Sequence, residues 1–154
     1  MSEHFANVAA YKGWLENFKF DKFFTLATND SVPPARMRDL LREWDGRMNR
    51  KLVGNKWVER IEDRMFPFYF LEKPITNPHW HGLVRFVGDE PKRVKQQLIF
   101  DEQIEKLWRK LVPTGTAVVR QVYDQKGANE YVAKELYHEL QYMQMVTPDE
   151  FERG

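Results

Sequence analysis

The group in this sequence best suited to chemistry is His79-Trp80-His81, two imidazoles separated by one residue. In an extended strand, residues two apart point to the same face, so both histidine rings would project together while Trp80 faces the other way. Two converging imidazoles can bind a metal ion, although a structural zinc site and a pair of hydrogen-bonded surface histidines are alternatives. The spacing therefore predicts a metal site and leaves its purpose open.

Glu72 is the candidate third ligand. It ends an aromatic run seven residues before His79, and the turn-rich segment 73–78 would fold that run against the histidines as an antiparallel hairpin. Three protein ligands leave positions open for water or phosphate, as in catalytic metal sites. Mg²⁺ or Mn²⁺ suits phosphate chemistry, while imidazole also suits zinc and nickel. A solvated charge at the hairpin end is the alternative for Glu72.

A tyrosine is the candidate nucleophile, because the chain has no cysteine and no GxxxxGK[ST] phosphate loop. Two Tyr-x-x-Lys sequences occur, Tyr123 with Lys126 and Tyr131 with Lys134. We expect Tyr131 and Lys134 to share one face of the last helix, where the ammonium can stabilise phosphate charge or lower the phenol pKa. Tyr123 is the rival nucleophile, and an amphipathic helix that buries Tyr131 is the structural alternative.

The elements that must position these residues follow from periodicity and breakers. We expect an N-terminal helix to about residue 18, a helix from 33 whose spacing continues past Gly54 to Trp57 and Ile61, and helices over 91–111 and 128–145. Strands are expected over 22–28, 65–72, 79–87 and 116–123. This order predicts an α+β fold with a ferredoxin-like or RRM-like antiparallel central sheet flanked by helices. We expect one domain over 1–154, with a helical extension over 1–20 and a flexible tail from about residue 147.

Composition and charge set limits on the function. The net charge of +1 gives no support to nucleic-acid binding, but residues 36–60 carry eight Lys or Arg against four acids. That stretch is either a solvated helix face or a phosphate-facing surface. No apolar run is long enough to span a membrane, and the N-terminus has no signal-peptide pattern. We therefore expect an intracellular protein, cytoplasmic if bacterial and nuclear if from a eukaryotic virus.

These motifs, in this order, resemble the HUH endonuclease family, and in particular its replication-initiator (Rep) branch. Strand 23–28 is similar to the family's first motif, the segment 78–84 around the histidines to its His-hydrophobic-His second motif, and Tyr131-Val132-Ala133-Lys134 to its third. Glu72 takes the place of the acidic ligand present in many members. Because Gly127 stands where two-tyrosine members have a second tyrosine, the resemblance is to a single-tyrosine nuclease domain.

The resemblance implies nicking and rejoining of single-stranded DNA through a 5′-phosphotyrosine, in the initiation of rolling-circle replication. It implies Glu72, His79 and His81 as metal ligands, Mg²⁺ or Mn²⁺ as the cofactor, and an origin hairpin as the DNA partner. Arg85 is a candidate contact to the DNA backbone because strand alternation places it on the histidine face, and packing at the helix edge is equally compatible. His138, two helical turns after Tyr131, is left without a role.

Two alternative functions stay open. A HUH-type transposase relative would share this chemistry but act on transposon ends. A non-catalytic nucleic-acid-binding domain could instead keep the histidines as a structural metal site.

Overall fold

The architecture is taken from a computed structural model that describes residues 19–72, 76–122, 145–148 and 151. Its elements follow one another as β1 (Lys22–Ala27), α2 (Pro34–Val53), the 3₁₀ turn η1 (Ile61–Asp63), β2 (Phe66–Glu72), β3 (His79–Arg85), α3 (Glu90–Leu111), β4 (Thr116–Gln121) and the short β5 (Met145–Val146). Of these, β5 was not expected from the sequence.

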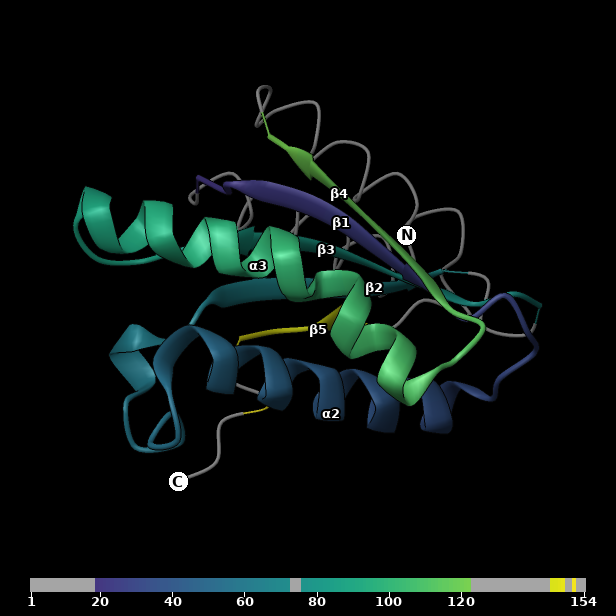
Figure 1. Ribbon diagram of the computed structural model, residues 1–154. Helices are drawn as coiled ribbons and strands as arrows, with labels where there is room; N and C mark the ends of the chain where they lie inside the picture. Colours follow the sequence, from purple (N-terminus) through teal and green to yellow (C-terminus); the bar gives the residue numbers. More distant parts are fainter. Residues whose placement is uncertain (1–18, 73–75, 123–144, 149–150, 152–154) are drawn as a thin grey trace, which may run out of the picture.

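The strands form one antiparallel sheet in the order β4-β1-β3-β2-β5. Two crossovers through helices place β3 between β1 and β2, which is the split βαβ arrangement of ferredoxin-like folds. Figure 1 shows α2 and α3 side by side over one face of this sheet. The predicted α+β fold with a ferredoxin-like sheet flanked by helices is confirmed.

Pro34 and Gly54 mark the two ends of helix α2. Pro34 occupies the first helical turn, where a missing N–H costs nothing. Six apolar residues spaced along one face are buried: Met37, Leu40, Leu41, Trp44, Met48 and Leu52. The predicted continuation past Gly54 is wrong, because Gly54 has a φ of +114° and its N–H bonds back to Arg50 O, which ends the helix.

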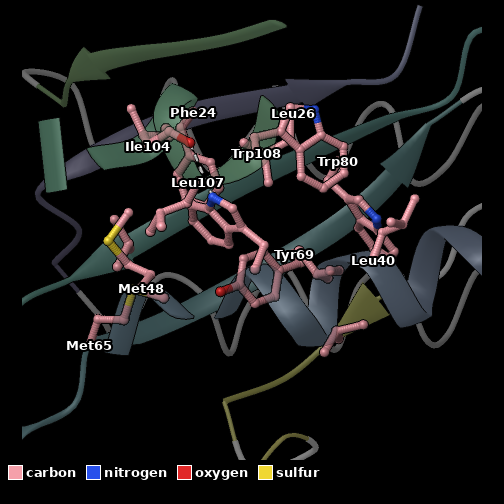
Figure 2. Close-up of a cluster of buried hydrophobic side chains, with 14 of the residues drawn as sticks. Phe24, Leu26, Leu40, Met48, Met65, Tyr69, Trp80, Ile104, Leu107 and Trp108 are labelled. Carbon is pink, nitrogen blue, oxygen red and sulfur yellow. Dashed lines mark hydrogen bonds between the residues drawn. The ribbon is translucent and has the colours of Figure 1, made fainter. Parts of the chain in front are cut away.

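The core between helices and sheet is aromatic and is tied by indole hydrogen bonds (Figure 2). Trp44 Nε1 donates to Ile104 O at 3.2 Å, joining α2 to α3. Trp80 Nε1 donates to Met37 O at 2.9 Å and so ties β3 to α2. Buried tryptophans stabilise a core only when the N–H finds an acceptor, and these bonds supply one. The Trp80 bond holds β3, the strand that carries the histidines, against α2.

Gly82 follows the histidines because the core leaves no room there for a side chain. A Cβ at this position would lie 2.1 Å from Cζ of Phe24, far inside van der Waals contact. Phe24 is itself fully buried and packs its ring against Trp44 and Tyr69. The glycine in His-Trp-His-Gly therefore lets the Phe24 ring of β1 lie directly against β3.

A buried polar network lies beside this aromatic core. The Tyr69 hydroxyl donates to Asp45 Oδ2 at 2.5 Å, and Asn49 Nδ2 donates to Asp45 Oδ1 at 3.2 Å. Asn49 Oδ1 in turn accepts from the Met65 N–H. Burial raises the pKa of Tyr69 well above its ordinary value, and the negative charge of Asp45 raises it further. The network joins α2 to β2.

The predicted N-terminal helix, final helix and tail lie at the two ends of the chain. The N-terminal helix over 1–18 lies outside the described residues. So does the final helix, except that Met145 belongs to β5, where it pairs with Phe70. Phe151, within the expected tail, is buried and packs against Tyr69 at 6.2 Å between ring centroids. Among the described residues, no helix combines the length and the apolar character needed to cross a membrane.

Candidate functional site

The β2–β3 hairpin brings the three predicted metal ligands onto one face of the sheet. Glu72 is paired with His79, and Phe70 with His81, in the antiparallel register. On the other side of β3, Thr25 of β1 is paired with His81. Since Trp80 and Phe24 point into the helix-covered core, alternation places Glu72, His79, His81 and Thr25 on the opposite face.

His81 is held from both neighbouring strands. Its Nε2 contacts Glu72 Oε2, and its Nδ1 lies 3.0 Å from Thr25 Oγ1. A neutral imidazole that donates Nε2–H to the carboxylate accepts the Thr25 hydroxyl proton at Nδ1. His81 is only 8% exposed, so this orientation is also enforced by packing. The result is a carboxylate–imidazole–hydroxyl chain that runs across three strands.

Two neighbouring rings lie nearly parallel to the His81 ring and restrict its orientation. The His79 ring is stacked nearly parallel to it, with centroids 6.2 Å apart and 7° between the planes. The Phe23 ring stacks on the other side, at 5.7 Å and 18°. Half-buried His79 and buried His81 therefore present a rigid pair of imidazoles.

One side of this face is open to solvent. Val118 of β4 is paired with Thr25 and is 53% exposed, a high value for a valine. Arg120, paired with Phe23 two residues along, is also exposed, as is Arg85 at the end of β3. Exposed cations thus lie on the same face as His81, which is itself buried.

Glu72, His79 and His81 have the chemistry of ligands for a divalent metal, but these side chains would have to move to hold one. Two imidazoles and a carboxylate are ligands for Mn²⁺, zinc or Mg²⁺. Within the described ranges, however, no group of three or more His, Asp or Glu side chains could hold an ion as placed. At this site Glu72 and His81 are in direct contact, and a bound ion would have to replace that contact.

Other predicted residues are placed elsewhere or fall outside the described residues. Tyr131, Lys134, Tyr123 and His138 lie outside them, so the relation of the nucleophile to the histidines stays a prediction. The basic side chains of α2 belong to the helix layer, on the far side of the sheet from the imidazoles. They therefore do not face the imidazoles.

Sequence reasoning missed Thr25 and Arg120. Both belong to predicted strands, and both have the parity of the histidine face. The signal that could have found them is the strand order of a ferredoxin-like sheet, in which the first strand lies next to the third and the fourth next to the first. The sheet topology therefore adds a hydroxyl and a cation to the site.

Neither a protein-family model, nor a curated protein, nor a solved structure matches this chain.

Proposed function

We propose that this chain is a metal-dependent endonuclease that nicks and rejoins single-stranded DNA through a 5′-phosphotyrosine intermediate, in the initiation of rolling-circle replication of a plasmid or virus. The observation that carries the proposal is the arrangement of Glu72 and His81 in contact, with His79 stacked beside them, on the sheet face away from α2 and α3. The motif order of the HUH endonucleases supports the same assignment.

Glu72, His79 and His81 would hold the metal, for which Mg²⁺ or Mn²⁺ is proposed. Such an ion, when bound, supplies charge that polarises the nonbridging oxygens of a phosphodiester. Thr25 keeps the His81 ring in one orientation, because its hydroxyl occupies the nitrogen that does not face Glu72. Phe23 restricts the same ring by stacking.

Tyr131 is the proposed nucleophile. Its phenolate oxygen would form a bond to phosphorus while the bond from phosphorus to the 3′ oxygen breaks, leaving a phosphotyrosine at the 5′ end and a 3′ oxygen that takes up a proton to become a hydroxyl. Rejoining reverses both changes, so no external oxidant or energy source is needed. Lys134, one helical turn away in the expected helix, would stabilise the phosphate charge.

The solvent-exposed side of the site supports a polymeric and flexible substrate. The phosphate of an extended strand could approach over Val118, whereas an enclosed pocket would select a small molecule. Exposed Arg120 and Arg85 lie on the same face and would neutralise flanking phosphates. A HUH-type transposase relative shares all of these features, and only the choice of DNA substrate separates it.

A non-catalytic nucleic-acid-binding domain is the second candidate, and one observation favours it. Both ring nitrogens of His81 have protein partners, as expected of a histidine whose role is structural. In that case a metal held by the histidines would be structural, and adding Mn²⁺ would leave the DNA uncut.

Cleavage of end-labelled single-stranded hairpin oligonucleotides, with Mn²⁺ and again after chelation, separates the two candidates. We expect cutting by the unaltered chain only with Mn²⁺, and strongly reduced cutting by His81→Ala. Val94→Ala is the matched control, since it truncates an exposed valine of α3, in the helix layer away from the imidazoles. Cutting that survives chelation, or that His81→Ala leaves unchanged, contradicts the proposal.

A further inference from the structure

A separate pocket of about 390 Å³ lies where β3 passes into α3. It is lined by Lys19, Arg85, Phe86, Val87, Gly88 and Arg93. Half of these described lining residues are cationic at neutral pH, and none of them is acidic. The pocket is therefore a local concentration of positive charge on a chain whose net charge is only +1.

Asp21 is a carboxylate bonded to this lining, and it offsets only part of the positive charge. Asp21 Oδ1 accepts from Arg93 Nη2 at 3.1 Å, and its Oδ2 accepts from the Phe86 N–H at 2.8 Å. Both oxygens thus serve to hold the pocket wall in place. Asp21 thus offsets one of the three lining cations, and a guanidinium has five N–H donors, of which this ion pair uses one from Arg93.

Gly88 brings the two arginines together. Its φ of +104° is a conformation that other residues rarely adopt, and it turns the chain from β3 into α3 within a few residues. A Cβ at this position would also lie 2.7 Å from Cδ of Lys92. Arg93, in the second turn of α3, is thereby returned to the end of the strand that carries Arg85.

We propose that this pocket binds a backbone phosphate of the single-stranded nucleic acid, a different phosphate from the one that is cut. The choice of ligand rests on the proposed function. Arg85 and His81 share a face of β3 and are four residues apart, about 13 Å along a strand. Arginine suits phosphate because its planar donors match two oxygens at once. A strand bound at the histidines would thus reach the pocket with its next phosphates.

The test is equilibrium binding of a labelled single-stranded oligonucleotide in chelator, where no cutting occurs, followed by fluorescence anisotropy at several salt concentrations. Arg85→Ala and Lys19→Ala each remove one exposed lining cation. Lys110→Ala is the matched control, because it removes an exposed cation from the last turn of α3, away from the pocket. Thermal unfolding of each variant verifies that the fold is retained.

We expect Arg85→Ala and Lys19→Ala each to weaken binding and to lower the slope of log K against log salt by about 0.7, the value for one phosphate contact on a single strand. Lys110→Ala should leave the slope unchanged. If all three variants behave alike, or if the unaltered chain binds no DNA, the pocket assignment is overturned.

Because binding is measured without metal, this result is independent of nicking. A chain that binds through Arg85 but never cuts would sustain the pocket and refute the proposed function. A chain that cuts DNA but whose binding does not depend on Arg85 would sustain the proposed function and refute the pocket.

Discussion

Glu72 is paired with His79 across the β2–β3 ladder, yet its carboxylate contacts His81, the diagonal neighbour on the same face. Diagonal positions in an antiparallel pair are within reach of a long side chain, so this contact needs no distortion of the strands. It leaves Thr25 on β1 as the partner of the second ring nitrogen. The orientation of His81 is thus set jointly by three strands.

Thr25→Val should weaken Mn²⁺ binding by about 10- to 100-fold, the usual effect of removing a residue that orients a metal-bound histidine. Valine has nearly the same shape as threonine but offers no oxygen to Nδ1 of His81. Calorimetric titration with Mn²⁺ measures the effect, and Thr25→Ser, which keeps the hydroxyl, should restore most of the affinity. Equal affinities for the valine and serine variants would rule out an orienting role for Thr25.

The fold should not depend on metal. The hydrophobic core cluster lies between the sheet and the helices, on the face away from the histidines, so the metal-free chain should unfold cooperatively at an ordinary temperature. Mn²⁺ at about 100 times its Kd should add about 2.7 kcal/mol to the free energy of unfolding. Calorimetry with and without chelator measures both. Glu72→Ala should lose the Mn²⁺ increment, and Glu62→Ala, an exposed carboxylate on η1, should keep it. An unfolded metal-free chain would instead identify a structural site.

Gly82→Ala should destabilise the fold by about 1–3 kcal/mol, because the new methyl group overlaps the Phe24 ring. Urea unfolding measures the loss. In a Phe24→Leu background the smaller side chain leaves space, so the added cost of Gly82→Ala should fall, and the two changes should not be additive. Additive losses would mean that the Phe24 ring is not what excludes a side chain at position 82.

Tyr69 should make the fold sensitive to alkali. Burial and the neighbouring Asp45 raise the pKa of its hydroxyl, so the folded chain keeps a proton that the unfolded chain releases near pH 10. The contribution of Tyr69 to the free energy of unfolding is therefore fully present below about pH 10. It declines as pH rises toward the folded pKa, by up to about 1.4 kcal/mol per pH unit. Tyr69→Phe should start less stable at neutral pH, because Asp45 loses a hydrogen bond, and should decline less steeply. Urea unfolding across the alkaline range tests this, and identical slopes would show that Tyr69 is not responsible.

Periodicity and turn chemistry were sufficient to predict strands β1 to β4, helices α2 and α3, and the face occupied by the histidines. They could also place Glu72 at the right end of the hairpin, because a hairpin pairs residues that are close in sequence. The end of α2 was missed because apolar spacing continues past Gly54, whereas its positive φ stops the helix. A local break can thus override a longer pattern.

The remaining features of the site depend on contacts between distant parts of the chain. Thr25 is 56 positions from its partner His81, and only the order of strands in the sheet brings them together. The short strand β5 has two residues and pairs with β2 from far along the sequence, so no periodic signal precedes it. Similarly, the choice of Glu72 between two imidazoles is a matter of side-chain rotamer, on which sequence spacing has no bearing.

The most direct test of the account is to incubate the chain with labelled single-stranded hairpin oligonucleotides and Mn²⁺, separate the products on a denaturing gel, and locate any DNA-linked residue by mass spectrometry. We predict a covalent adduct on Tyr131 that is absent from Tyr131→Phe, absent after chelation and retained in Tyr123→Phe. An adduct on Tyr123 would contradict the assignment of the nucleophile. No adduct from a broad oligonucleotide library, with His81 intact and Mn²⁺ bound, would contradict the proposed enzyme itself.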